Sequence, residues 1–271
     1  MKYLCEQLGV SRSGFYSWAN RSVSERDLED IDLSEQIQQI HRDCKGIYGS
    51  PRIHETLQQQ GILVSRKRVA RLMREMGLKG RVVTVTKRQP ALREFSASGQ
   101  NMRLKAPEVT GPNQQWVADI TYIRVKKRWR YLAVVMDVYS RRILGWSLGR
   151  RRTVGLTLQA LTRALKGRLP CKRMIFHTDR GIEYRGFRFQ ERLRLLGIQA
   201  SVNRPGTCTD NAHMESFFHS LKGELIRGNV YETDQQLRGT LRWYINYFYN
   251  RVRLHSGIDY WTPEAYDLSS R

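Results

Sequence analysis

The sequence has no long apolar run. Its longest apolar stretch, from Tyr131 to Met136, has the length of a strand and falls well short of the roughly 18 residues that a membrane-spanning helix requires. The first residues, MKYLCE, have no apolar core of the signal-peptide type. These features exclude an integral membrane protein built on helices and predict a protein of the cytoplasm.

Cysteine is scarce and scattered. The four cysteines, at positions 5, 44, 171 and 208, form no Cys-x-x-Cys pair. We therefore expect reduced thiols rather than a disulfide framework. A zinc site built from His41, Cys44 and His54 is conceivable, but this spacing fits no standard ligand pattern.

Acidic residues are few relative to basic ones. The chain has 47 Lys and Arg against 25 Asp and Glu, which gives a net charge of +22. Such an excess favours a polyanionic partner, because each neutralised phosphate releases counterions. An anionic membrane surface is the rival partner, but no amphipathic basic anchor is evident, so we expect nucleic acid.

Two helical segments precede the main domain. Residues 1–33 are predicted to form an appendage whose first 19 residues contain two short helices, with Gly9 as the break and Ser11 as a cap. A packing role and a DNA-contacting role are both open for it. Residues 34–79 are predicted to form an all-α helix-turn-helix domain, with one helix capped by Ser50 and starting at Pro51, and a basic helix capped by Ser65. The candidate DNA contacts of the basic helix are Arg66, Lys67, Arg68, Arg71 and Arg74. An ordinary solvated basic helix is the alternative.

Residues 80–110 have the composition of a basic linker. Periodicity fades there, and Pro90, Gly99 and Pro107 interrupt it. Between positions 65 and 105 there are 12 basic and 2 acidic residues. We expect the linker to lie along DNA phosphates, although an unattached basic tether would have the same composition.

Residues 111–227 alternate between strand and helix patterns. Strands are predicted at 114–125, 129–138 and 142–149, followed by a helix, a strand at 173–178, a helix at 187–196, a short strand at 198–202 and a last helix. The order βββαβαβα predicts an α/β domain with a mixed sheet and an RNase H-like fold.

Three carboxylates stand out in this domain. Asp119 interrupts an otherwise apolar strand, Asp179 ends another strand, and Glu215 lies one turn into the last helix. Hard divalent cations prefer carboxylate oxygens, and two such ions can stabilise both oxygens of a phosphoryl transfer. We therefore predict that the three acids are catalytic and bind two Mg²⁺ ions, with Mn²⁺ as a substitute.

The helix that contains Glu215 has further polar residues. His219 and Lys222 lie on the face of Glu215, four and seven residues later, and are candidate DNA contacts. Asp210 is the predicted N-cap of the helix. Two other acids rank below the triad: Asp137 is predicted to shape a turn, and Glu183 is a candidate secondary ligand.

Residues 228–271 are predicted to be a helical and basic extension. A helix at 233–250 contains many aromatic residues, most of which core packing would explain. Arg251, Arg253 and His255 follow it, and we predict that Arg253 and His255 contact DNA, with a structural role as the open alternative.

Several motifs are similar to those of one protein family. They are YGSPRI at 48–53, WVADITY at 116–122, DVYSRRILGW at 137–146, HTDRG at 177–181, the tripeptide Asp-Asn-Ala at 210–212, ESFF at 215–218, LKGE at 221–224, YNRVRLH at 249–255 and TPE at 262–264. In this combination the chain resembles the downstream-frame transposases of the insertion-sequence-three family, within the retroviral-integrase superfamily. The chain departs from the family pattern at Ile182-Glu183 and at 207–209.

The resemblance implies an integrase-type catalytic core and a DDE triad of Asp119, Asp179 and Glu215, with 35 residues between the last two. It implies cleavage that frees a 3′-OH at the element end, then strand transfer, with a circular intermediate. It also implies double-stranded DNA partners, namely terminal inverted repeats and target DNA, and a homo-oligomer on DNA. An upstream-frame DNA-binding protein would be fused to this chain or act as its partner. The resemblance also implies a bacterial cytoplasmic protein that associates with the nucleoid.

Two other functions remain open. One is a structure-specific RNase H-like nuclease that does not join ends. The other is a DNA-binding regulator with a silent catalytic domain, whose expected marker would be a lost carboxylate.

Overall fold

The computed structural model describes residues 1–20, 24–81, 99–168, 170–171 and 173–270. The chain divides into two compact units, Met1–Arg81 and Val82–Arg271, which are described separately. No helix in the described residues is long and apolar enough to span a membrane.

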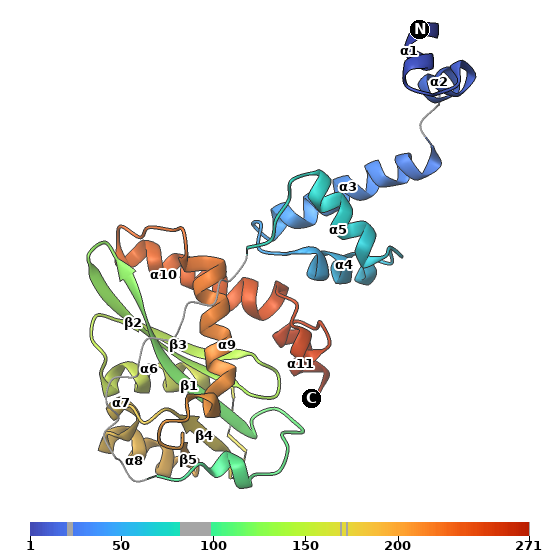
Figure 1. The fold of residues 1–271 in the computed structure, drawn as a ribbon. Helices are drawn as coiled ribbons and strands as arrows, with labels where there is room; N and C mark the ends of the chain where they lie inside the picture. The colour runs from blue at the N-terminus through green and yellow to red at the C-terminus, as the bar shows by residue number, and fades with distance from the viewer. Residues whose placement is uncertain (21–23, 82–98, 169, 172, 271) are drawn as a thin grey trace. The chain divides into compact units, whose positions relative to one another are not determined.

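The first unit is helical (Figure 1). Its helices are α1 (Lys2–Gln7), α2 (Arg12–Ala19), α3 (Glu25–Asp43), α4 (Ser50–Gln59) and α5 (Arg66–Glu75). The two predicted N-terminal helices are present, and Ser11 caps α2 by accepting from the backbone N–H of Gly14. The predicted boundary between residues 33 and 34 is wrong, because it falls inside α3.

Helices α3, α4 and α5 pack on a common apolar core formed by Ile37, Ile53, Leu57 and Val69, which are all fully buried. Ser65 caps α5 as predicted, by accepting from the N–H of Arg68 at 3.2 Å. The cap predicted for α4 was wrong by one residue. Ser50 is its first residue, Gly49 is the N-cap, and no side chain caps the helix.

The second unit is built on a five-stranded mixed sheet. Its elements up to the last helix of the sheet domain are β1 (Gln115–Val125), β2 (Arg128–Asp137), β3 (Ile143–Gly149), α6 (Val154–Leu165), β4 (Ile175–Thr178), α7 (Ile182–Arg185), α8 (Phe187–Leu195), β5 (Gln199–Val202) and α9 (Ala212–Leu221). The strand order is β3-β2-β1-β4-β5. Strands β1, β2 and β3 pair antiparallel, whereas β4 pairs parallel with both β1 and β5. This topology confirms the predicted RNase H-like fold.

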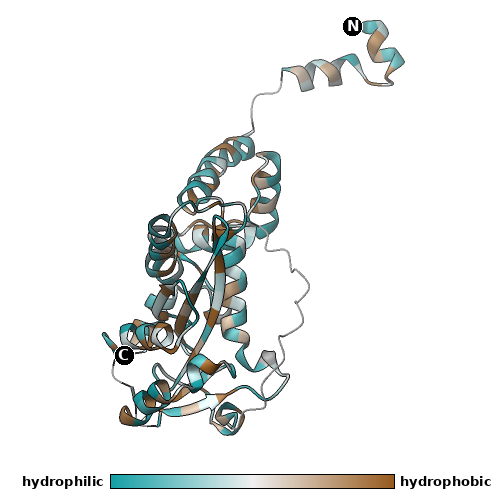
Figure 2. Ribbon diagram, turned by 90° about the vertical axis from the view of Figure 1, so that its left-hand side faces the viewer, coloured by the Kyte–Doolittle hydropathy of each residue, from teal (hydrophilic) through white to brown (hydrophobic). Residues whose placement is uncertain are grey.

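Side chains of alternate strand residues fill the core on one face of the sheet. Trp116, Ala118, Ala133 and Val135 point from β1 and β2 into the same cluster as the apolar face of α6 and α8. Figure 2 shows the hydrophobic colour gathered on the sheet strands, with teal and brown alternating around the helices. Because both faces of β1 and β2 are largely buried, these strands hold their polar side chains in fixed positions.

The linker prediction fails for residues 99–105. They include a short 3₁₀ turn, η1 (Met102–Lys105), that packs against β4 and β5. The carbonyl of Gln100 accepts from the Val202 N–H at 3.2 Å, and the Met102 N–H donates to the Ser201 hydroxyl at 2.9 Å. This segment therefore covers the edge of the sheet. Residues 82–98, where phosphate contacts were predicted, lie outside the described residues.

The C-terminal residues continue as helices. They form π-helical turns at η3 (Lys222–Ile226) and η4 (Trp243–Val252), the helix α10 (Asp234–Arg242), a 3₁₀ turn η5 (Ser256–Ile258) and the helix α11 (Pro263–Ser269). The predicted aromatic helix therefore exists. Core packing explains Tyr244, Phe248 and Tyr249, which are buried, whereas Tyr247 is half exposed.

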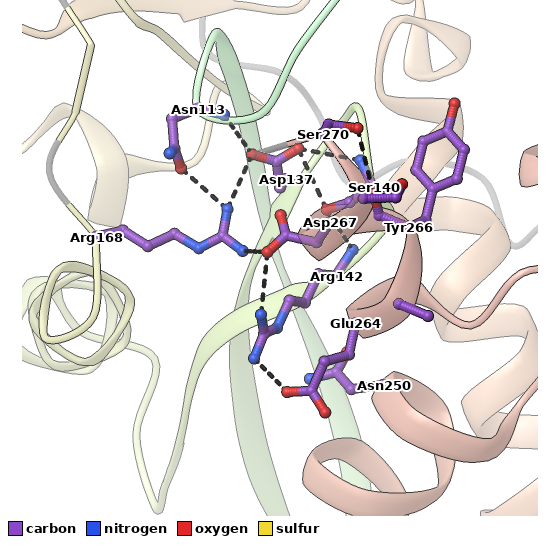
Figure 3. A network of polar contacts seen from close by, with 12 residues as sticks. Asn113, Asp137, Ser140, Arg142, Arg168, Asn250, Glu264, Tyr266, Asp267 and Ser270 are labelled. Atoms are coloured by element: carbon purple, nitrogen blue, oxygen red, sulfur yellow. Dashed lines mark hydrogen bonds and ion pairs between the residues drawn. The ribbon is translucent and has the colours of Figure 1, made fainter.

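A buried polar network attaches α11 to the sheet domain (Figure 3). The fully buried Asp137 accepts from the N–H groups of Asn113, Tyr139 and Ser140, which confirms its predicted role in shaping a turn. Arg168 bridges Asp137 and Asp267 of α11. Since these charges neutralise one another inside the protein, Asp137 belongs to the scaffold and not to the catalytic site.

Candidate functional site

The sheet register places Asp119 beside Asp179. Val117 of β1 pairs with His177 of β4 in the parallel ladder, and each aspartate lies two residues further along its own chain. Residues two apart on a strand share a face, and adjacent strands are about 4.8 Å apart. The two carboxylates therefore reach the same region, at the point where β4 ends and β1 continues.

Helix α9 brings Glu215 to the same region. The helix packs against β1, and the Asn211 amide at its start donates to the carbonyl of Ala118 at 3.1 Å, next to Asp119. The predicted N-cap was wrong. Asn211 holds the N-cap position without a side-chain cap, and Asp210 instead pairs with Arg204 and accepts from Asn101.

The electrostatics of Asp119 reflect this arrangement. Burial, the charge of Asp179 and, less strongly, the charge of Glu215 raise the pKa of Asp119 to about 8, although the Ile120 N–H and Arg152 act in the opposite direction. A carboxyl with so high a pKa holds its proton near neutral pH unless a cation replaces it. The donor set, three carboxylates with hard oxygens, fits a divalent metal.

The side chains of Asp119, Asp179 and Glu215 do not converge on a common metal position in this structure. Across the described residues, no three His, Cys, Asp or Glu side chains are close enough together to hold a metal ion. Arg152 instead takes one oxygen of Asp179, with 3.5 Å between its Nη2 and Oδ2. Metal binding at the triad would therefore require side-chain rotation and displacement of Arg152. His41, Cys44 and His54, which belong to the described residues, likewise form no group that could hold a metal ion, so the structure does not support the zinc alternative.

We expect the metal-free protein to lose stability as the pH rises. The folded pKa of Asp119, about 8, exceeds its ordinary value of 3.8. Its contribution is therefore fully present below about pH 4 and is lost as the pH rises through about 8. The variant Asp119→Asn should melt at a higher temperature than the wild type at about pH 9 in a chelator, and the gap should close at about pH 4. Thermal unfolding at both pH values measures this, with the exposed Glu108→Gln as control. An equal gap at both pH values would contradict the assignment.

Polar atoms without partners surround the acids. Among the described residues, Oε2 of Glu183, the hydroxyl of Tyr184 and Oδ1 of Asn211 are buried and accept or donate no hydrogen bond. The charges of Asp119 and Asp179 raise the pKa of Tyr184 further above the level that burial gives it. Buried polar groups are normally satisfied, so their gathering at one place marks a functional site.

His219 of α9 and Lys222, the first residue of η3, extend the site. Both residues are exposed, and the Lys222 ammonium lies 5.1 Å from the ring centre of the half-exposed Tyr122. Loss of hydration around the ammonium lowers the pKa of Lys222, while the nearby charge of Asp119 opposes this shift. Lys222 is thus a cation beside the acids and in reach of solvent, as a phosphate contact must be.

The prediction that Arg253 contacts DNA is wrong. This residue is buried, and its guanidinium donates to both oxygens of the buried Glu224 at 2.7–3.1 Å. The charge of Glu224 raises the pKa of Arg253 despite its burial. Burial and pairing remove Arg253 from the candidate DNA contacts. His255 packs its ring against Tyr249, with 4.6 Å between the centroids.

The basic face of α5 is smaller than predicted. Arg68 and Arg71 form ion pairs with Asp30 of α3, and Arg71 also pairs with Glu75. Arg66, Lys67 and Arg74 are exposed and have no ion-pair partner in the part of the chain that the structure describes. These three remain as candidate DNA contacts, whereas Arg68 and Arg71 mainly join two helices.

Arg152 and Asn211 were not predicted as site residues from the sequence. Arg152 is one of three consecutive arginines, so its sequence gives no signal that it alone faces the acids. Asn211 belongs to the motif at 210–212, but only the fold shows that its amide reaches β1.

Models of known protein families match most of the chain. An integrase core domain model matches residues 109–208, a second integrase core model matches 196–263, and a helix-turn-helix-like model matches 27–85. The chain is 36% identical to the transposase InsF for insertion sequence IS3A of Escherichia coli K12, over 98% of this chain and 93% of that protein. It is 37% identical to the transposase for insertion sequence element IS904 of Lactococcus lactis, over 92% of this chain and 98% of that protein.

Solved structures are more distant. The HTLV-2 integrase catalytic core domain in complex with magnesium is 21% identical, with a TM-score of 0.45, over 59% of this chain and 99% of that chain.

Proposed function

The chain belongs to the insertion-sequence-three family of DDE transposases, which are metal-dependent polynucleotidyl transferases, and from this premise we propose that Asp119, Asp179 and Glu215 are its catalytic carboxylates. They would hold two Mg²⁺ ions, with Mn²⁺ as a substitute. The observation that carries the proposal is the register that sets Asp119 beside Asp179, together with the charge of Glu215 acting on Asp119.

The residues suit the chemistry of DNA cleavage and joining. When bound, the divalent metal supplies charge stabilisation at the phosphodiester and activation of the attacking water or 3′-hydroxyl. Asp119 and Asp179 offer oxygens from two rigid neighbouring strands, and Glu215 offers its oxygens from a helix tied to β1 by Asn211. Lys222 of η3 would hold a DNA phosphate next to them, with His219 one turn earlier in α9.

Further DNA contacts would orient the substrate. Arg66, Lys67 and Arg74 of the helix-turn-helix unit would contact DNA, with α5 placed for a major groove. The substrates would be the terminal inverted repeats of the element and a target duplex, on DNA of the bacterial nucleoid. The active form would be a homo-oligomer on DNA, fused to or partnered with the product of an upstream reading frame.

A joining assay separates this function from its rivals. The full chain, or its fusion with the upstream product, is given element ends that are already cut to leave a free 3′-OH, with Mg²⁺ or Mn²⁺. A transposase yields covalent joint products, whereas a structure-specific nuclease yields only shorter strands. Binding of the ends without any cutting or joining would favour a regulator and refute the proposal.

A further inference from the structure

Arg152 lies between two acids at the site. It stands in the segment between β3 and α6, one residue before the helix cap Thr153. Its Nε forms an ion pair with Oε1 of Glu183, and its Nη2 is 3.5 Å from Oδ2 of Asp179. The Arg152 side chain is 42% exposed, whereas that of Glu183 is only 4% exposed. One guanidinium therefore joins a buried carboxylate to a candidate metal ligand.

Glu183 is held firmly in place. Its backbone carbonyl accepts from the hydroxyl of the buried Thr157 at 3.2 Å, which connects α7 to α6. Its second carboxylate oxygen is buried and has no hydrogen-bond partner in the described part of the chain. Since a buried charge requires a partner, Glu183 fixes the position of Arg152.

Gly181 shows how closely these groups approach. A Cβ atom built there would lie 2.5 Å from Oε2 of Glu183, 2.7 Å from Nη2 of Arg152 and 2.9 Å from Oδ1 of Asp179. The Gly181 N–H donates to Oδ1 of Asp179 at 3.0 Å. The backbone thus engages one Asp179 oxygen and Arg152 the other, so a cation bound at Oδ2 would meet the positive charge of the guanidinium.

We propose that Arg152, fixed by Glu183, is an internal counter-ion that competes with the divalent metal for Asp179 and so weakens metal binding at the site. The proposal rests on the assignment of Asp179 as a metal ligand. The pair would keep the acidic cluster neutralised without metal and set the metal concentration at which the site fills. Glu183 then acts through Arg152 and not as a ligand of its own.

The test measures Mn²⁺ binding to the full chain by isothermal titration calorimetry without DNA. Arg152→Gln should tighten binding by about tenfold, because one positive charge next to a ligand is removed. Glu183→Gln should weaken binding by about tenfold, because Arg152 then faces Asp179 alone. The double variant should bind Mn²⁺ about as tightly as Arg152→Gln, because Glu183 acts through Arg152 and has no effect once Arg152 is removed. Arg151→Gln, which removes the adjacent exposed arginine, should leave the affinity unchanged.

The alternatives give different results. If Glu183 is itself a ligand, the double variant stays as weak as Glu183→Gln, and the proposal falls. If Arg152→Gln leaves the affinity unchanged, or if Arg151→Gln tightens it equally, Arg152 is no specific competitor. Should Arg152→Gln fail to fold, the comparison of Glu183→Gln with the double variant decides the same question. Wild-type affinity in Asp179→Asn would instead refute the assignment of the triad.

Discussion

Replacing any one of Asp119, Asp179 and Glu215 with its amide should reduce end cleavage and strand transfer by at least about a thousandfold. Each substitution keeps the shape of the side chain but removes the charge that would hold the metal. Asp119→Asn also removes a carboxyl whose pKa is raised to about 8 by its burial and by the charge of Asp179, so its fold should remain intact. The loss should appear equally with uncut and with pre-cut ends, because the same carboxylates would serve both steps.

A matched control separates catalysis from charge. Glu191→Gln removes an acid that forms an ion pair with Arg194 on the surface of α8, so it should retain activity within a few-fold of the wild type. Binding of the element ends, measured by gel shift, should survive in all three triad variants. If one of these variants joins ends at the wild-type rate, that residue does not belong to the catalytic set.

The second large effect concerns stability. Arg253→Met should destabilise the sheet-containing unit by about 3–5 kcal/mol, because it leaves the buried carboxylate of Glu224 without its partner. The Tyr244 hydroxyl, 2.6 Å from Glu224, cannot replace a full positive charge. Urea unfolding followed by tryptophan fluorescence measures the change.

Two further variants make the Arg253 result specific. Arg251→Met removes an exposed arginine two residues away, whose ion pair with Glu264 lies at the surface, and should cost about 1 kcal/mol or less. Combining Arg253→Met with Glu224→Gln should recover much of the lost stability, since no buried charge is left unpaired. A loss for Arg253→Met no larger than that for Arg251→Met would mean that the pair contributes little.

The sequence predicted the sheet because local patterns decide it. The apolar alternation of β1 to β3 and the breaks between them are readable within a few residues, and the order of strands and helices then leaves few topologies. The placement of Asp119 in mid-strand and of Asp179 at a strand end followed from the same patterns. Their proximity depends on the pairing of β1 with β4, which the structure supplies.

The errors arose where a side chain has a partner far away in the sequence. Arg253 looked like a free basic residue, but its partner Glu224 lies on another helix, and Arg68 is paired with Asp30 of α3. Asp210 fitted a helix cap by position, yet Arg204 and Asn101 hold its carboxylate. Residues 99–105 looked like a linker because no periodic pattern marks a segment that only covers a sheet edge.

The most direct measurement is the anomalous X-ray scattering of manganese in crystals of the full chain soaked in Mn²⁺. We predict a peak within bonding distance of carboxylate oxygens from both Asp119 and Asp179, with Glu215 next to it or next to a second peak, and with Arg152 turned away from Asp179. Manganese bound elsewhere, with the three carboxylates still apart and Arg152 still on Asp179, would contradict the account.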